Sequence, residues 1–200
     1  MDEYRTEILP EPEENIEERK KNRSGCVSFA IDTLETVLLA LVLFFAINAV
    51  SARVRVDNIS MQPTLKAGEF LLLNRLAYRT GEPVVGDIVV FHYPGDPKED
   101  YIKRVIGTPG DQVDIANGKV RVNGQELTEP YIAEAPMYAG TWTVPEDSLF
   151  VLGDNRNQSS DSHSWGFVPM KNVVGKALLI YWPPSQMRIL SHTQEVQAAP

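Results

Sequence analysis

The sequence predicts an all-β, mostly antiparallel domain on a single N-terminal transmembrane helix. One reason is a strongly apolar run without any charge between Glu35 and Arg53. The other is a series of short apolar or alternating runs after it, separated by glycine, proline and asparagine, in which no segment repeats apolar residues every 3.6 positions. We therefore divide the chain into a charged tail, a transmembrane anchor, a β domain and a frayed C-terminus: residues 1–28, 29–52, 53–190 and 191–200.

The composition is that of a globular chain with enough apolar mass for a core, since 43% of its 200 residues are hydrophobic and 23% are charged. The chain has a net charge of -8 and lacks the excess of basic residues that tight nucleic-acid binding needs. A single cysteine, Cys26, excludes an internal disulfide and a cysteine-based zinc site, and the three histidines form no HExxH motif. We expect no nucleic-acid partner, no metal and no cofactor.

The first 28 residues form a tail whose charge changes sign. Acidic residues dominate up to Glu18, and the basic residues Arg19, Lys20, Lys21 and Arg23 follow. Because the tail has almost no apolar periodicity, we expect it to be disordered, with helix only near the membrane.

The apolar run Phe29–Val50 has about the length of 20 residues that a helix needs to cross a bilayer. A helix buried in a soluble core would normally show a polar stripe, and this run shows none. A cleavable signal peptide is the open alternative, because Val50-Ser51-Ala52 offers small residues at a possible cut. The run exceeds the apolar stretch of about 7–15 residues in a signal peptide, which favours an uncleaved anchor.

The flanking charges predict the orientation of this anchor. The basic cluster before the run outweighs Arg53 and Arg55 after it, so the positive-inside rule places the N-terminus in the cytosol. The β domain then lies on the extracytoplasmic side, and the only thiol, that of Cys26, stays on the reducing side.

The β domain is predicted from apolar runs and from turn signals. Three runs are apolar enough for buried strands: Phe70–Leu73, Asp87–Phe91 and Ala177–Trp182. Asn117-Gly118 separates two alternating runs and is a strong β-hairpin signal, and Asn123-Gly124 predicts a second turn directly after it.

Residue chemistry alone does not define an active site here. His163 lies beside Ser162 and close to Asp161, but sequence neighbours rarely form the Ser-His-Asp arrangement that nucleophilic catalysis uses. No pair of carboxylates stands out either. At this level the sequence predicts only a membrane-tethered β domain.

Four segments nevertheless follow one another in a specific order: Asn58–Leu65 with its Ser60-Met61-Gln62-Pro63-Thr64-Leu65 motif, Gly86–Phe91, Asp100–Asp111, and Gly153–Ser162 with Trp165-Gly166. Behind a membrane anchor, they resemble the nucleophile box, the next strand, the lysine box and the C-terminal box of type I signal peptidases. The resemblance covers residues 37–183 and implies a signal-peptidase/LexA-like β fold. The short stretch from Gly107 to Pro145 resembles compact members that lack a second domain.

The resemblance implies a serine–lysine dyad, with Ser60 as the nucleophile and Lys103 as the general base. A lysine normally has a pKa near 10.4, and burial can lower it by several units. Strand alternation places Lys103 on one face with Tyr101 and Val105, and Arg104 on the other.

Other site residues follow from the same resemblance. Ser159 would hydrogen-bond Lys103 and hold its amine toward Ser60. The oxyanion hole would use the backbone N–H of Ser60 and the side chain of Asn58, a position where members commonly have serine or glycine. Four residues are expected in structural ion pairs, the last of them standing where many members carry arginine: Arg104, Asp154, Asp161 and His163.

The substrates implied are exported preproteins, whose signal peptides would be removed after small residues such as alanine. An extended peptide would add to a strand edge beside the bilayer. The candidate lining residues, each with core packing as the alternative role, are Val54, Val56, Met61, Leu65 and Ile102. The nearest candidates for a loop dipping into the membrane, with core packing favoured for each, are Met137, Tyr138 and Trp142.

Two other functions stay open. One is a non-catalytic tethered β domain that binds preproteins. The other is a LexA-like self-cleaving protein, but the chain has no helix-turn-helix and its two Ala-Gly pairs, Ala67-Gly68 and Ala139-Gly140, both lie downstream of Ser60. His163 is similar to the residue of members from photosynthetic lineages, so the host membrane is either a plasma or a thylakoid membrane.

Overall fold

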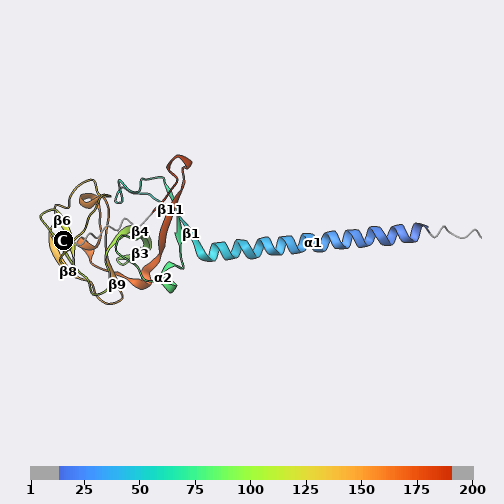
Figure 1. The fold of residues 1–200 in the computed structure, drawn as a ribbon, viewed down its shortest axis with the longest axis horizontal. Coiled ribbons are helices and arrows are strands. Elements are labelled where there is room, and N and C mark those ends of the chain that lie inside the picture. Colours follow the sequence, from blue (N-terminus) through green and yellow to red (C-terminus); the bar gives the residue numbers. More distant parts are fainter. Residues whose placement is uncertain (1–13, 191–200) are drawn as a thin grey trace, which may run out of the picture. The chain divides into compact units, whose positions relative to one another are not determined.

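A computed structural model describes residues 14–190 (Figure 1). The chain separates into two compact units, with the boundary between Ile47 and Asn48. The expected tail before residue 14 and the expected frayed end, residues 191–200, lie outside the described residues.

The first unit consists of helix α1, Glu14–Val50, whose last turn continues into the second unit. Its segment Ser28–Val50 has 23 residues and is long and apolar enough to cross a membrane. The side chains of Phe29 and Phe45 are 72% and 65% exposed, as expected of a helix whose apolar surface contacts lipid. Because α1 already begins at Glu14, the disorder expected for the tail does not extend past that residue; glutamate, lysine and arginine are good helix formers.

The second unit contains an eight-stranded sheet in which every pair of neighbours is antiparallel. Its order is β1-β2-β11-β3-β4-β9-β10, and β12 pairs with β11. Strands β1 and β10 lie at the two ends of this order. In the order of the sheet, the strands are β1 Ser51–Arg55, β2 Phe70–Asn74, β11 Val173–Trp182, β3 Ile88–Tyr93, β4 Asp96–Gly107, β9 Ser148–Leu152, β10 Val168–Pro169 and β12 Arg188–Ile189.

A second, four-stranded sheet lies at the end of this unit away from β1 and β11 (Figure 1). Its strands, in the order of the sheet, are β7 Gln125–Glu126, β6 Lys119–Val122, β5 Gln112–Ala116 and β8 Gly140–Thr143. Asn117 and Gly118 both have positive φ, 52° and 74°, in the turn between β5 and β6. This is the conformation that a tight hairpin turn requires, so the hairpin prediction is confirmed.

The helices of the second unit are short. The α-helices are α2 Ala77–Thr80 and α3 Ser162–Trp165, and the 3₁₀ turns are η1 Arg156–Gln158, η2 Met170–Asn172 and η3 Pro184–Gln186. The prediction of a mostly antiparallel β domain behind one apolar helix is therefore confirmed.

The last five residues of strand β4, Lys103 to Gly107, are buried on both faces. Val105 packs in one hydrophobic cluster with Phe91 and Val151, whereas Ile106, on the opposite face, packs in another with Phe150. A strand covered on both sides reads as a continuous apolar run rather than an alternating one. Any charged side chain in this part of β4 must therefore be buried too, and two are: Lys103 and Arg104.

Candidate active site

Lys103 and Ser60 lie in direct contact. Nζ of Lys103 donates a hydrogen bond to Oγ of Ser60 over 2.8 Å, and the two residues are only 2% and 7% exposed. Lys103 belongs to β4, while Ser60 lies in the turns that follow β1. Asn155 holds those turns in place, because its backbone N–H donates to the carbonyl of Ser60 and its side-chain amide to that of Ile59.

Burial lowers the pKa of Lys103 from its ordinary value of 10.5 to about 8. The cause is the loss of water around the ammonium, and it outweighs the opposing attraction of the carboxylates of Asp161 and Asp154. The ring of Tyr101, on the same face of β4, lies 5.3 Å from Nζ. A lysine in this niche holds a substantial neutral fraction near neutral pH, which is what a general base requires.

Asn58 contacts Ser60 differently from the expectation. Its Oδ1 accepts hydrogen bonds from both the Ser60 hydroxyl, at 2.9 Å, and the Ser60 backbone N–H, at 3.3 Å. An oxyanion hole needs donors, so in this state Asn58 occupies the backbone donor instead of adding a second one. The reason is local: with two Ser60 donors facing it, the side-chain amide must turn its oxygen toward them.

Ser159 is near the dyad, but its expected hydrogen bond with Lys103 does not form. Its Oγ is buried and has no hydrogen-bond partner among the described residues, because Lys103 donates to Ser60 instead. A Cβ added to Gly153 would meet Ser159 Oγ at 2.2 Å and the Ser60 carbonyl oxygen at 2.4 Å. Both serines therefore lie against Gly153, and only a residue without a side chain fits between them. The sequence analysis gave Gly153 no role.

Arg104 and Asp154 form a fully buried, two-pronged ion pair. Nε and Nη2 of Arg104 donate to the two carboxylate oxygens at 2.8 and 2.7 Å, and Nη1 donates to the carbonyl of Gly86. The guanidinium lies 3.8 Å from the ring centre of Tyr131. These contacts raise the pKa of Arg104, so it stays charged. The pair joins β4 to the segment after β9 and so fixes where Gly153 lies relative to Lys103.

A second buried pair escaped the sequence analysis. Nη1 and Nη2 of Arg156 donate to the carboxylate of Glu129 at 2.9 and 2.5 Å, and Nε donates to the Gly153 carbonyl. Glu129 and Arg156 are 27 positions apart and belong to no common periodic element, so no sequence pattern predicts that they pair. The pair anchors η1 beneath the Ser60 segment.

Asp161 and His163 also lie together, with Oδ1 and Nδ1 2.6 Å apart. Oδ2 of Asp161 accepts the backbone N–H of Gly153, and Oδ1 also accepts the N–H of His163 at the start of α3. The ring of Tyr138 stacks on the imidazole at 3.8 Å. Asp161 thus connects His163 to Gly153, and Ser162 takes no part, because its Oγ accepts the Val151 N–H.

The expected substrate pocket is not open in this structure. Val56, Met61 and Leu65 are at most 1% exposed and belong to the core cluster beneath β2 and β11. Val54 and Ile102 are half-buried against the same cluster. The first three thus take the alternative role, core packing, in this structure, and their contact with a substrate stays a prediction.

Of the three candidates for a membrane-dipping loop, one side chain is exposed and two pack against other rings. Met137 is 83% exposed, whereas Trp142 packs against Phe150 and Tyr138 stacks on His163. Core packing, the favoured role, thus describes Tyr138 and Trp142 but not Met137.

A cavity of about 520 Å³ lies close to Ser60, on the side of Asn155. It is lined by polar side chains and small residues, among them Gln62, Lys66, Ala133 and Gln158. Neither Ser60 nor Lys103 lines this cavity, but Asn155, which holds the Ser60 turns, does.

Comparison with known proteins identifies the family of this chain. The sequence profile of the family described as "Signal peptidase, peptidase S26" matches residues 30–182. The chain is 40% identical over 195 residues to "Probable signal peptidase I-2" of Synechocystis sp., covering 92% of this chain and 89% of that protein. It is 41% identical over 166 residues to "Signal peptidase I" of Leptolyngbya laminosa, covering 78% and 82%. "Probable thylakoidal processing peptidase 2, chloroplastic" of Arabidopsis thaliana is 37% identical over 154 residues, covering 70% and 41%. The chain belongs to the signal peptidase family, peptidase S26.

Proposed function

We propose that this protein is a membrane-anchored serine endopeptidase that removes N-terminal signal peptides from exported preproteins, with Ser60 as nucleophile and Lys103 as general base. The observation that carries the proposal is the buried 2.8 Å hydrogen bond between Lys103 Nζ and Ser60 Oγ. Membership of the signal peptidase family supports the substrate class.

The first chemical step needs one rearrangement of the resting hydrogen bonds. The Ser60 hydroxyl donates to Asn58 Oδ1 and accepts from Lys103. For attack, the Ser60 proton must instead point at the lone pair of a neutral Lys103 amine. As the bond between Ser60 Oγ and the scissile carbonyl carbon forms, this proton passes to Lys103 Nζ and the carbonyl π electrons move to the oxygen.

The resulting oxyanion needs hydrogen-bond donors. The Ser60 backbone N–H becomes available once Asn58 Oδ1 leaves it, and a half-turn of the Asn58 amide brings Nδ2 to the same position. The Lys103 ammonium then protonates the leaving nitrogen as the C–N bond breaks. A water molecule, deprotonated by the same amine, hydrolyses the acyl-enzyme and restores Ser60.

Ser159 suits the role of second partner for Lys103. When the Ser60 hydroxyl turns its proton to the lone pair of Lys103, the amine N–H that Ser60 had accepted needs another acceptor. The buried Ser159 Oγ, without a partner and close to Ser60 against Gly153, is a suitable one.

An extended substrate fits the edge of the main sheet. Among the described residues β1 pairs with β2 and lies at one end of the sheet order, so an extended substrate could add along this end strand shortly before Ser60. Val54 on β1 and Ile102 on β4 are half-buried against the core cluster that contains Met61, the residue after Ser60. Small side chains fit such a shallow surface, in keeping with a preference for alanine.

We place the N-terminus in the cytosol, the catalytic unit on the extracytoplasmic side, and the anchor in a plasma or thylakoid membrane. The charge asymmetry around the apolar run supports this orientation. The relatives from cyanobacteria and from the chloroplast support these two membranes. An uncleaved anchor is supported by β1, because Ser51 and Ala52 pair with Asn74 and Leu73 and a cut after Ala52 would divide the strand.

The test is cleavage of a preprotein with an Ala-x-Ala motif by the detergent-solubilised full-length protein. Ser60→Ala and Lys103→Ala should each abolish cleavage at the single expected bond. Lys103→Arg should fail as well, because a guanidinium stays protonated at any usable pH. The matched controls Ser185→Ala and Lys98→Ala remove exposed groups of the same kind and should keep full activity.

The outcomes separate this function from the two alternatives. Loss of cleavage with an intact fold supports the dyad. Retained cleavage in either dyad variant contradicts it. Absence of cleavage by the unaltered protein, with preprotein still bound, would favour a non-catalytic tethered domain. Cleavage only of its own chain would favour LexA-like self-cleavage.

A further inference from the structure

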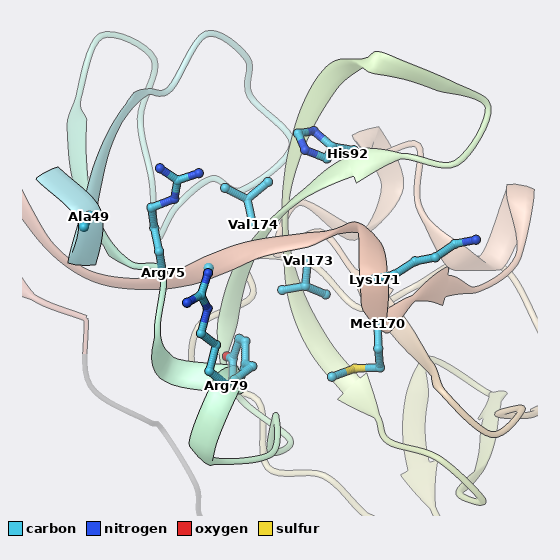
Figure 2. Close-up of a pocket in the computed structure, with 10 residues that line it drawn as sticks. Ala49, Arg75, Arg79, His92, Met170, Lys171, Val173 and Val174 are labelled. Atoms are coloured by element: carbon cyan, nitrogen blue, oxygen red, sulfur yellow. The ribbon is translucent and has the colours of Figure 1, made fainter.

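A second cavity, of about 620 Å³, lies in the second unit, Asn48–Pro200 (Figure 2). Ala49 in the last turn of α1 lines it, together with Arg75 at the end of β2 and Arg79 in α2. Val173 and Val174, at the start of β11, supply apolar wall. None of these residues belongs to the dyad or its supports.

The cavity concentrates positive charge on a chain whose net charge is -8. Arg75, Arg79 and Lys171 all line it, and no carboxylate of the described residues forms an ion pair with any of the three. Figure 2 shows the side chains of Arg75 and Arg79 extending on the same side of the cavity, while that of Lys171 extends away from them. The fourth basic residue, His92, is paired with Asp100 at 2.7 Å. Arg75 and Arg79 are therefore two guanidinium groups in the lining of one cavity that no described carboxylate pairs with.

Ala49, in the wall of the cavity, belongs to the last turn of the apolar segment. The apolar segment Ser28–Val50 has 23 residues, and as a helix it rises about 35 Å. A hydrocarbon core is about 30 Å thick, so the last turn of the helix, with Ala49, reaches the headgroups. Arg75 is held at this level because its backbone N–H donates to the carbonyl of Val50 over 2.9 Å. This placement holds for either orientation of the anchor and does not depend on the proposed catalytic function.

We propose that this cavity binds the phosphate headgroup of an anionic glycerophospholipid through Arg75 and Arg79. Guanidinium groups bind phosphate oxygens in a two-pronged geometry, which suits a phosphodiester between two arginines. Val173, Val174 and Ala49 offer apolar contact to the glycerol and first acyl carbons of a lipid. A free phosphate ion has no such carbons. A bound lipid would attach the acidic β domain to the bilayer at a second point beside the anchor.

The test titrates the delipidated full-length protein, in neutral detergent, with phosphatidylglycerol and separately with phosphatidylcholine, and counts bound lipid by native mass spectrometry. Phosphatidylglycerol should bind at least about tenfold more tightly than phosphatidylcholine, whose trimethylammonium cancels the phosphate charge. Arg75→Gln with Arg79→Gln should weaken phosphatidylglycerol binding at least about tenfold, and Arg75→Lys with Arg79→Lys should restore most of it. The single glutamine variants provide the same comparison if the double variant does not fold.

The control is Arg53→Gln with Arg55→Gln, which removes two exposed charges just after the same helix but outside the cavity; Arg55 lies 3.5 Å from Asp57. It should leave phosphatidylglycerol affinity within about twofold, since general surface attraction is the only contribution removed. An equal loss in both pairs of variants would overturn the site in favour of diffuse attraction. Displacement of the lipid by equimolar inorganic phosphate would show a free-anion site and overturn the lipid assignment.

Discussion

Nζ of Lys103 lies 2.8 Å from Oγ of Ser60, although 43 residues separate them in the chain. The contact exists because the last five residues of β4 are covered on both faces, so its Lys103 cannot reach bulk water, and because Asn155 holds the Ser60 turns against that strand. The same burial that lowers the pKa of the amine puts it beside the hydroxyl. Five predictions follow from this site.

Replacing Lys103 by methionine should stabilise the protein at neutral pH. The pKa of Lys103 is about 8 in the folded state against 10.5 ordinarily, so the unfolded state binds the proton more tightly. The free energy that burial of the protonated amine costs the folded state is therefore fully present below pH 8 and disappears as the pH rises through 10.5. Lys103→Met should raise the free energy of unfolding by about 2 kcal/mol at pH 7, with much less gain above pH 10.5.

Denaturation of the solubilised protein at both pH values measures this effect. Lys98→Met, an exposed lysine at the start of β4, is the control and should change stability little at either pH. A methionine variant that is less stable than the unaltered protein at pH 7 would mean that the surroundings of Lys103 stabilise its charged amine, and would contradict the lowered pKa.

Asn58→Asp should impair catalysis strongly. A carboxylate of the same shape can still accept from the Ser60 hydroxyl and backbone N–H, but it has no N–H to give and repels the oxyanion. We expect kcat to fall about 10²–10³-fold with little change in KM. Asn58→Ser, which keeps a donor, should retain most of the activity. Equal activity of the aspartate and serine variants would remove Asn58 from the oxyanion hole.

Gly153→Ala should disable the site by steric conflict. The added Cβ would lie 2.2 Å from Ser159 Oγ and 2.4 Å from the Ser60 carbonyl oxygen, and the latter is backbone held by Asn155. We expect kcat/KM to fall at least about 100-fold, since misplacement by about 1 Å costs that much. Gly124→Ala, in the β6–β7 turn, has open space around the added Cβ but a φ of 82°, so it adds backbone strain away from the site without a steric conflict and should keep cleavage intact. An active Gly153→Ala enzyme would show that the two serines can separate without loss.

Ser159→Ala should lower activity without lowering stability. No hydrogen bond is lost in the resting state, because the Ser159 hydroxyl has no partner among the described residues. If it receives the Lys103 amine during attack, kcat should fall about tenfold or more, while KM and the melting temperature stay nearly constant. Steady-state kinetics with a peptide substrate and a thermal melt decide this, and an unchanged kcat would assign Ser159 to packing alone.

The sequence predicts the scaffold of this protein better than its site. The apolar run ending at Val50 and the Asn117-Gly118 hairpin follow from length, hydropathy and turn chemistry, which are local properties. The contact of Ser60 with Lys103 was expected only through resemblance to signal peptidases, because nothing in the spacing of two residues on separate elements brings them together.

The remaining details depend on three-dimensional surroundings. Which atom of the Asn58 amide faces Ser60 is decided by two donors that meet only in the folded turn. The pairing of Arg156 with Glu129 joins two irregular segments, where no periodicity operates. Met61 has the same apolar character whether it lines a pocket or fills the core, and only the fold places it in the core.

The most direct test of the neutral-base mechanism is an NMR titration of the Lys103 side chain in the full-length protein, with ¹³C- and ¹⁵N-labelled lysine and the Lys103 signal assigned by its absence from Lys103→Met. The amine should titrate with a midpoint near pH 8, well below the ordinary lysine value of 10.5. A midpoint above pH 10, with the protein folded and active, would contradict a role for Lys103 as the neutral base of Ser60.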